Sequence, residues 1–407
     1  MKRNWLYLPI EVKVRECDAK LLLAYHAIQQ GYNVIIGDHP VLEQVCGKYP
    51  QGIFFSKGGP HGFRQRVISS ALEKKHSVVE LDEEGLIFQK KLYLQDRMQK
   101  QTLHLVEQEY CWGPHQYNTI LSAYPDLKAK LHITGNPRFD LLTPKYRKLY
   151  EADRLKLKAK YGDFILINTR FSRYNTPKGL KESIHYQHIQ KLYEHFLKMI
   201  QHLASLVPDK KIIIRPHPGE NFTSYRKALQ QYTNILVVHE GNIIPWLYAA
   251  EAVIHHGCTS GMEAYLLGRP VISYIPFETM EPSLPNQFGQ IARNSDEIIR
   301  NLEKFINKET LPPVTGKMED YVQWSPSHDS CQTILSLCNQ ISLSLPLDRF
   351  SKKEGSKMIV RTKKRKRNFS LTKDEIVSFF QKMNQVNETE ILFEVKPVAN
   401  HVFHLSC

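Results

Sequence analysis

The chain has 407 residues, of which 42% are hydrophobic and 24% charged, and its formal net charge is +14. This length accommodates two domains plus an extension, and the hydrophobic content is sufficient for packed cores, which excludes a disordered protein. The apolar stretches are strand-sized and broken by charges, and the start Met1-Lys2-Arg3 lacks the features of a signal peptide. We therefore expect a cytoplasmic protein without a membrane-spanning segment.

The cysteines form no CxxC pair and have no histidine-rich partner segment, which argues against both a disulfide framework and a zinc site. We expect reduced thiols and no metal. Cys258 lies in a turn of interest below, where a small buried residue is its expected role.

The first part of the chain alternates between strand-like runs and segments with helical periodicity. One such segment is Ala19–Gln30, for which Asp18 is the expected N-cap. This alternation predicts an α/β domain over residues 1–140. The strand-like runs are Trp5–Ile10, Asn33–Gly37, Gly52–Ser56, Ser77–Leu81 and Leu131–Thr134.

A second α/β domain is predicted over residues 141–345, after the turn Gly135-Asn136-Pro137-Arg138 and a charged helical stretch from Tyr146 to Tyr161. Residues 346–407 form an expected basic extension with a helix over Leu371–Met383 and a strand over Glu390–Val395. The second series of strand-like runs is Phe164–Asn168, Lys211–Arg215, Ile235–His239, Ala252–His255 and Pro270–Tyr274.

Two turns that follow these runs carry groups suited to phosphate. Lys211–Arg215 leads into Pro216-His217-Pro218, and Ala252–His255 leads into a glycine-bearing turn with Thr259-Ser260-Gly261, which opens a helical run. A helix start presents unpaired N–H groups and a positive dipole end, and His217 and Arg215 add a donor and a charge. In doubly wound sheets ligands bind at the carboxyl ends of strands. The pattern predicts one phosphate site; solvated turns that only complete the packing are the alternative.

An acidic turn is the other candidate for chemistry. The run HSVVEL ends in Asp82-Glu83-Glu84-Gly85, which places three carboxylates at a strand end. Crowded acids raise one another's pKa, so one of them is suited to act as a general base toward a hydroxyl; a solvated loop is the alternative. A polar cluster after the first run is a candidate lining for the acceptor side, or a solvated helix start: Glu11, Lys13, Arg15, Glu16 and Asp18.

Basic residues concentrate in SKKEGSK at 351–357 and RTKKRKR at 361–367. Such clusters suit anionic membranes, nucleic acid or acidic substrates, and a solvated loop is the alternative. Because no interleaved aromatic residues or RNA-binding signature accompany them, we expect no nucleic-acid partner. The segment 351–367 is instead a candidate for peripheral contact with an anionic membrane.

Three short motifs occur in the order Glu83-Glu84-Gly85, His217-Pro218 and Thr259-Ser260. This order resembles the GT-B glycosyltransferases that use CMP-activated acidic sugars, namely bacterial sialyltransferases and polysialyltransferases and the Kdo transferases of capsule or lipopolysaccharide. Thr-Ser reverses the more usual order of the hydroxyl pair. The segments LPIEVKVRECDAKLLLA and GCTSGMEAYLLGRPVISY also resemble proteins described only as surface carbohydrate biosynthesis proteins, over most of residues 1–345.

The resemblance implies a GT-B fold, with two Rossmann-like domains facing across a cleft, and transfer of a sugar such as Kdo or sialic acid to a glycan or lipid-linked glycan acceptor. The nucleotide-sugar is a substrate, and no cofactor is expected. Glu83, with Glu84 in reserve, would activate the acceptor, Glu263 would meet the nucleotide ribose, and Glu11, Arg15 and Glu16 are acceptor-side candidates. The remaining donor-side candidates are Arg215, His217, Pro218, Gly257, Thr259, Ser260 and Gly261.

Other resemblances leave the donor open. RPHP followed by a turn and helix resembles the teichoic-acid CDP-glycerol phosphotransferases, and TGNPRFD resembles a segment of sugar-nucleotide epimerases and lipid A disaccharide synthase. A CDP-polyol or UDP-sugar transferase, a 2-epimerase and a non-catalytic nucleotide-binding scaffold therefore remain alternatives.

Overall fold

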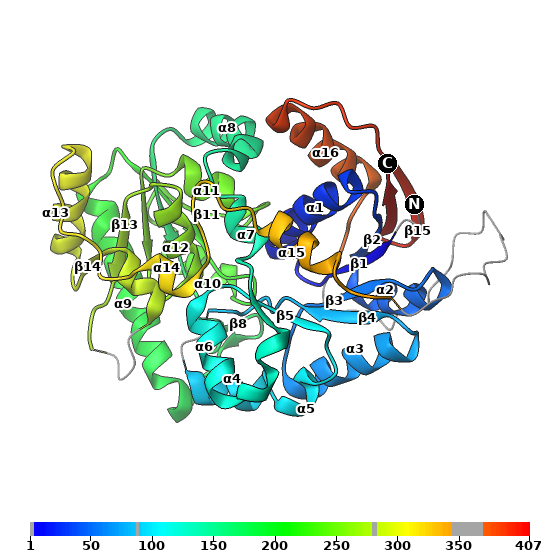
Figure 1. Ribbon diagram of the computed structural model, residues 1–407. Coiled ribbons are helices and arrows are strands. Elements are labelled where there is room, and N and C mark those ends of the chain that lie inside the picture. Colours follow the sequence, from blue (N-terminus) through cyan, green and yellow to red (C-terminus); the bar gives the residue numbers. More distant parts are fainter. Residues whose placement is uncertain (1–3, 87–88, 279–282, 344–368) are drawn as a thin grey trace. The chain divides into compact units, whose positions relative to one another are not determined.

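The computed structural model describes residues 4–86, 89–278, 283–343 and 369–407 (Figure 1). The chain divides into two compact units: unit 1 contains Met1–Leu149 and Lys317–Cys407, and unit 2 contains Tyr150–Gly316. The expected boundaries at residues 140 and 345 therefore differ from the structure. The chain returns to unit 1 after Gly316, because Asp140 accepts hydrogen bonds from the backbone N–H (2.9 Å) and hydroxyl (2.8 Å) of Ser330.

Unit 1 is built on an eight-stranded sheet of order β15-β16-β2-β1-β3-β4-β5-β6. Its first six strands in chain order are parallel, whereas β16 is antiparallel to β2 and β15 antiparallel to β16. The strands are β1 (Trp5–Ile10), β2 (Asn33–Asp38), β3 (Ile53–Ser56), β4 (Ser77–Glu80), β5 (Gln108–Cys111), β6 (Leu131–Ile133), β15 (Glu394–Ala399) and β16 (Val402–Ser406).

The α-helices of unit 1 are α1 (Lys13–Gln29), α2 (His39–Val45), α3 (His61–Glu73), α4 (Lys90–Asp96), α5 (Lys100–Leu103), α6 (Pro114–Ala123), α7 (Pro137–Asp140), α14 (Met318–Tyr321), α15 (Ser330–Cys338) and α16 (Lys373–Asn387). Short 3-10 helices are η1 (Cys46–Lys48), η2 (Pro125–Lys130) and η3 (Tyr146–Tyr150).

The first helix begins earlier than expected. It starts at Lys13, so Asp18 lies inside α1 and is not its N-cap. The fully buried carboxylate of Glu16 accepts a hydrogen bond from the backbone N–H of Glu11 at 2.8 Å, which fixes the chain at the start of the helix. The polar residues Lys13, Arg15, Glu16 and Asp18 therefore lie in the first turns of a helix, and Glu16 is buried there and not solvated.

The carboxyl-terminal segment is an integral part of unit 1, which corrects the expectation of an appended extension. The expected strand over Glu390–Val395 is displaced, and the hairpin β15–β16 instead adds to the edge of β2, where the backbone N–H of Asp38 donates to the carbonyl of His401 at 3.0 Å. Apolar side chains of α16, including Phe380, pack against Tyr25 of α1. The basic runs 351–357 and 361–367 lie outside the described residues.

Unit 2 contains a six-stranded parallel sheet of order β11-β10-β7-β12-β13-β14. Numbered from β7, this is the 3-2-1-4-5-6 order of a Rossmann sheet, and the order reverses at β7. Beside it lies a small antiparallel pair, β8 with β9. The strands are β7 (Phe164–Asn168), β8 (Asn175–Thr176), β9 (Gly179–Leu180), β10 (Lys211–Arg215), β11 (Ile235–Val237), β12 (Ala252–His255), β13 (Val271–Tyr274) and β14 (Gln290–Ala292).

One face of this sheet is covered by the long helix α9, whose Phe196, Ile200 and Leu203 share a buried core with Ile165 of β7 and Ile214 of β10. The α-helices of unit 2 are α8 (Glu151–Tyr161), α9 (Gln187–Leu206), α10 (Phe222–Ala228), α11 (Ile243–Ala249), α12 (Thr259–Leu266) and α13 (Ser295–Ile306), and its 3-10 helices are η4 (Ile184–Tyr186) and η5 (Leu284–Phe288).

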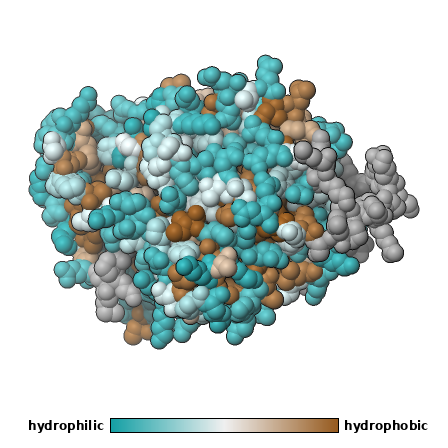
Figure 2. All heavy atoms as spheres, viewed as in Figure 1, coloured by the Kyte–Doolittle hydropathy of each residue, from teal (hydrophilic) through white to brown (hydrophobic). Residues whose placement is uncertain are grey.

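Figure 2 shows that hydrophilic residues cover most of the viewed face, with hydrophobic residues in small separate patches. Within the part of the chain that the structure describes, no helix has the length and apolar character needed to cross a bilayer.

The C-terminal hairpin generates a prediction. A chain ending at residue 343 should lose unfolding free energy and aggregate, because it would expose the edge of β2 and the apolar side of α1. Thermal unfolding and light scattering measure both effects.

The matched control keeps the full chain and replaces the Lys and Arg residues of 361–367 with Ser. If the truncated chain unfolds at the same temperature as this control and stays monomeric, the hairpin is not part of the fold of unit 1.

Candidate functional site

The carboxyl ends of three neighbouring strands in unit 2 meet at one edge. Asn168 at the end of β7 is in register with Arg215 of β10 on one side and with His255 of β12 on the other. Both turns expected to bind phosphate follow these strands directly. The structure thus brings the two turns to the same edge, at the point where the strand order reverses, which is where ligands bind in doubly wound sheets.

The loop after β10 presents His217. Its backbone N–H donates to the carbonyl of Thr169 at 3.1 Å and to Glu220 Oε1 at 3.0 Å, and its ring is exposed, as is Pro218. Its Nδ1 accepts a hydrogen bond from the backbone N–H of Gly219 at 3.1 Å. A neutral imidazole that accepts at Nδ1 carries its hydrogen on Nε2, so we assign Nε2 as the donor of this ring.

A buried carboxylate holds this loop in place. Glu220 accepts hydrogen bonds from the hydroxyl groups of Thr169 (2.9 Å) and Tyr225 (2.6 Å) as well as from the His217 backbone. Burial raises the pKa of Glu220, although these donors oppose the shift. Glu220 therefore ties the His217 loop to the end of β7, a role that its place in the motif RPHPGE did not reveal.

Arg215 is less available than expected. Its buried guanidinium donates to the carbonyl oxygens of Glu240 (2.7 Å) and Gly241 (2.6 Å) and lies over the ring of Trp246. Burial lowers the pKa of Arg215 to about 10. These contacts fix the position of the loop before α11. Arg215 would have to exchange these hydrogen bonds for new ones to contact a phosphate directly.

The turn after β12 is held closely by its neighbours. Ser260 Oγ accepts from Asn168 Nδ2 at 2.9 Å and donates to Cys258 Sγ at 3.0 Å. A side chain at Gly261 would place its Cβ 2.1 Å from His255 Nε2, so only glycine fits against this fully buried ring.

The glycine that begins this turn is also constrained. Gly257 has φ +58°, donates its N–H to Asn286 Oδ1 at 2.6 Å and accepts at its carbonyl from Arg170. Thr259 is half-buried at the start of α12, whereas Glu263 is buried within that helix.

Four residues of this edge were not predicted from the sequence: Asn168, Arg170, Glu220 and Asn286. Asn168 and Arg170 were identifiable in principle, because Asn168 ends a strand-like run and Thr-Arg directly follows it. Asn286 comes from a segment without a regular pattern, and nothing in the sequence indicated its contact.

In unit 1 the acidic turn after β4 separates its carboxylates. Asp82 is buried and paired with Arg97, whose Nε donates to Oδ2 at 3.0 Å. Glu83 is 7% exposed and pairs with the buried Lys20 at 3.3 Å, whereas the side chain of Glu84 is 56% exposed and pairs with Arg15 at 2.8 Å. One acid is therefore structural, one is enclosed beside a lysine, and one faces solvent.

The polar cluster after β1 joins this turn in one charge network. Lys57, which follows β3, contacts Glu11 at 2.8 Å and Glu16 at 3.2 Å. Burial lowers the pKa of Lys57, but Glu16, Glu11 and Glu83 outweigh that effect and raise it overall. The structure thus places Glu11, Arg15 and Glu16 beside Glu83 and Glu84 at one edge of the unit 1 sheet.

One group of potential metal ligands occurs among the described residues: Asp140, Asp329 and Cys331 have ligand atoms within 4.8 Å of one another. Asp140 is hydrogen-bonded to the first residue of α15, and burial raises its pKa to about 7. Asp329 caps the same helix. These contacts fix α15 on unit 1, and the group is separate from both strand edges described above.

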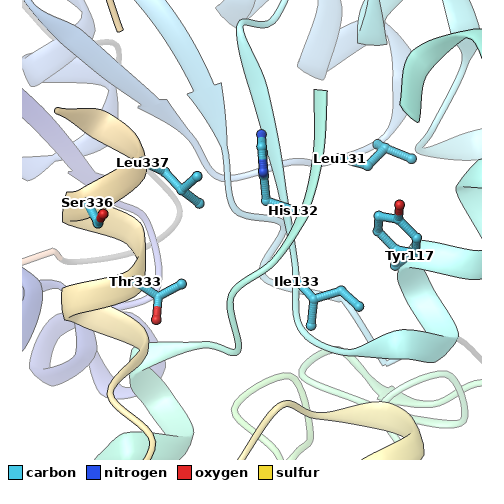
Figure 3. A pocket seen from close by; sticks show the side chains of 7 residues that line it. All are labelled: Tyr117, Leu131, His132, Ile133, Thr333, Ser336 and Leu337. Carbon is cyan, nitrogen blue, oxygen red and sulfur yellow. The ribbon is translucent and has the colours of Figure 1, made fainter. Parts of the chain in front are cut away.

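A groove of about 640 Å³ lies beside the edge strand β6, between α6 and α15 (Figure 3). It is lined by Tyr117, Leu131, His132, Ile133, Thr333, Ser336 and Leu337. Among the residues that the structure describes, no carboxylate, lysine or arginine lines it, so its chemistry does not match a site that activates a hydroxyl or binds phosphate.

The comparisons with known proteins agree with this architecture. A family model described as capsule polysaccharide biosynthesis protein matches residues 143–274, a range that contains both turns of the unit 2 edge. No curated protein matches the chain.

Solved structures with a similar fold include two 2-epimerases and a polymerase. UDP-GlcNAc 2-epimerase from Methanocaldococcus jannaschii, in complex with UDP-GlcNAc and UDP, has 14% identity and a TM-score of 0.51, over 83% of this chain and 99% of that chain. A putative UDP-N-acetylglucosamine 2-epimerase from Listeria monocytogenes has 12% identity and a TM-score of 0.55, over 83% of this chain and 96% of that chain. A variant of the wall teichoic acid polymerase TagF has 11% identity and a TM-score of 0.51, over 83% of this chain and 88% of that chain. These likenesses confirm the expected GT-B fold class.

The buried ring of His255 gives a pH prediction. Burial lowers its pKa from the ordinary 6.5 to about 3. Because the folded pKa lies below the unfolded one, the stabilisation is present above pH 6.5 and is lost as pH falls toward 3. The difference in unfolding free energy between wild type and His255→Asn should therefore shrink in this window, by up to about 1.4 kcal/mol per pH unit.

Denaturant unfolding at several pH values measures this difference, with the exposed His104→Asn as control. If the free energies of unfolding of wild type and His255→Asn change with pH in parallel, the buried ring of His255 is not neutral.

Proposed function

We propose that the protein is a glycosyltransferase of bacterial surface polysaccharide synthesis, which transfers a sugar from a nucleotide-activated donor to a glycan acceptor. The observation that carries the proposal is the meeting of the His217 loop and the Thr259-Ser260 turn at one strand edge of unit 2. The match of residues 143–274 to capsule polysaccharide biosynthesis proteins supports the same pathway.

The donor phosphate would bind at this edge. The N-terminus of α12 offers backbone N–H groups and the positive end of its dipole, and His217 Nε2 offers a further donor. Arg170 adds a positive charge beside the turn. With these donors in place, we propose that charge on the leaving nucleotide is stabilised by the protein without an obligatory metal ion.

A CMP-activated acidic sugar such as Kdo or sialic acid is the proposed donor, on the strength of the order of the three motifs. The likeness to TagF keeps a phosphotransferase with a CDP-polyol donor as an alternative, and the likeness to UDP-GlcNAc 2-epimerases keeps a UDP-sugar as another. Thermal unfolding with CMP, CDP and UDP at equal concentration separates these donor classes, because the nucleotide that binds most tightly stabilises the folded chain most.

The acceptor hydroxyl would be activated by the acidic turn of unit 1. The motif order favours Glu83 as the general base, whereas side-chain exposure favours Glu84. Glu83 is in addition the partner of the buried Lys20, so its replacement would affect both chemistry and the charge network.

Contact with an anionic membrane through 351–367 remains a proposal from sequence alone. Such a contact would bring the enzyme to a lipid-linked glycan acceptor. Each basic residue near anionic lipid contributes about 1 kcal/mol to the free energy of membrane binding.

The first functional prediction concerns His217. Replacing it with Ala should weaken nucleotide binding by about 1.5–3 kcal/mol, because a hydrogen bond to a charged phosphate is lost. Isothermal titration with the nucleotide that stabilises the wild type most measures this change.

His104→Ala, an exposed histidine in unit 1, is the matched control and should bind as the wild type does. Equal affinity of the His217→Ala variant and the control would remove His217 from the donor site.

The second prediction concerns the base. In a transfer assay containing EDTA, replacing the catalytic glutamate with Gln should lower the turnover rate by a factor of about 10²–10⁴. The affinity for the donor should stay nearly constant. Glu83→Gln and Glu84→Gln are compared, with Glu73→Gln at the end of α3 as control.

The proposal for the acidic turn fails if both variants keep near-normal turnover. Loss of all activity in EDTA, restored by magnesium, would instead contradict the metal-independent mechanism.

A further inference from the structure

Helix α9 of unit 2 carries a row of cationic and ionisable side chains along one side. His188, Lys191, His195, Lys198 and His202 follow one another at alternating spacings of three and four residues, which places them in a single stripe on a helix. All are exposed except His195, which is half-buried. At 1.5 Å per residue the stripe is about 21 Å long. We call these five residues the α9 stripe.

The two lysines of the stripe flank His195. Burial together with Lys191 and Lys198 lowers the pKa of His195. Among the described residues, no ion pair connects Lys191 or Lys198 with a carboxylate. Between positions 170 and 202 the sequence has six Lys and Arg residues, four histidines and only two acids, Glu182 and Glu194.

An aromatic ring from another segment holds three of these side chains. Phe277, which follows β13, has Lys191 Nζ 4.5 Å from its ring centroid, and the rings of His188 and His195 each lie at 5.3 Å in edge-on contact. The phenyl ring restricts the motion of these side chains before any ligand binds. Restricting side chains in advance reduces the entropy lost on binding, so this arrangement favours a ligand with negative charge.

The stripe begins near the candidate donor site. In a strand–helix–strand unit the helix starts at the carboxyl end of the preceding strand and runs back along the sheet, as α9 does after β7. Phe196 of α9 contacts the ring of His256, which follows β12. Burial lowers the pKa of His256, and the neighbouring Arg170 and His188 side chains lower it further.

We propose that the α9 stripe binds the chain of an acidic polysaccharide, with negatively charged sugars along the stripe and one end of the polymer directed toward the donor site of unit 2. The assignment of a glycan rests on the proposed function. A linear polymer matches a stripe that is one residue row wide, and the adjoining row contains Gln187, Gln190 and Glu194, whose polar groups suit sugar hydroxyls better than a lipid surface.

Direct binding without donor tests the proposal. Fluorescently labelled oligogalacturonate, a chain of carboxylated sugars, is titrated with the full-length protein, and fluorescence anisotropy reports binding. Lys191→Gln with Lys198→Gln should weaken binding at least tenfold and lower its dependence on salt, whereas Phe277→Leu should give a smaller loss. Lys304→Gln with Lys308→Gln, two exposed lysines in the same unit, is the matched control and should leave affinity unchanged.

All these variants keep residues 351–367, so any binding by that basic segment is the same in each. Unlabelled dextran of equal length should not compete, because it carries no charge. The proposal is overturned if the Lys191 and Lys198 variant binds oligogalacturonate as the control does, or if dextran competes. It is also overturned if phosphatidylglycerol vesicles or a single-stranded oligonucleotide show the stronger dependence on Lys191 and Lys198.

The His217→Ala variant separates this proposal from the proposed function. It should bind oligogalacturonate like the wild type, since it leaves α9 unchanged. If the wild type transfers no sugar but binds the polymer through the stripe, the transferase proposal fails and the stripe proposal stands. If it transfers sugar without binding the polymer through the stripe, the stripe proposal fails and the transferase proposal stands.

Discussion

The candidate site depends on the parallel pairing of β7 with β10 on one side and β12 on the other. This pairing aligns Asn168, Arg215 and His255 in one row, so the loops that follow them emerge side by side. The row is buried, and its polar groups are used to hold those loops: Asn168 holds Ser260 and Arg215 holds the loop before α11. The exposed His217 ring and the N-terminus of α12 are therefore positioned by groups that a ligand would not touch, which is the arrangement expected of a preorganised binding site.

The corresponding edge of unit 1 is organised by charge instead. Glu16, Lys20, Lys57 and Glu83 are all buried, and each has an oppositely charged neighbour. Removing one member of a buried ion pair leaves an uncompensated charge and is strongly destabilising, so these residues are constrained by stability whatever chemistry they perform. A functional role at this edge is therefore most easily separated from a structural one at Glu84, which faces solvent.

The sequence predicted the regular parts of the fold well. Strands β7, β10 and β12 were expected with the bounds they have, because each is a short apolar run bounded by polar residues. The start of α1 and the C-terminal hairpin were not, since the ion pair of the buried Glu16 with Lys57 and the pairing of β16 with β2 join distant parts of the sequence, which local patterns do not encode. The same limit applies to the candidate site: the His217 and Ser260 turns were proposed from residue type, whereas the contact of Asn286 with Gly257 depends on tertiary packing.

The central claim is that a nucleoside phosphate binds at the carboxyl edge of the unit 2 sheet. The most direct measurement is a crystal structure of the protein soaked with CMP, CDP or UDP. We predict density for a phosphate within hydrogen-bond distance of His217 Nε2 and of the backbone N–H groups at the start of α12. A nucleotide bound only elsewhere, for example in the groove beside β6, would contradict the account.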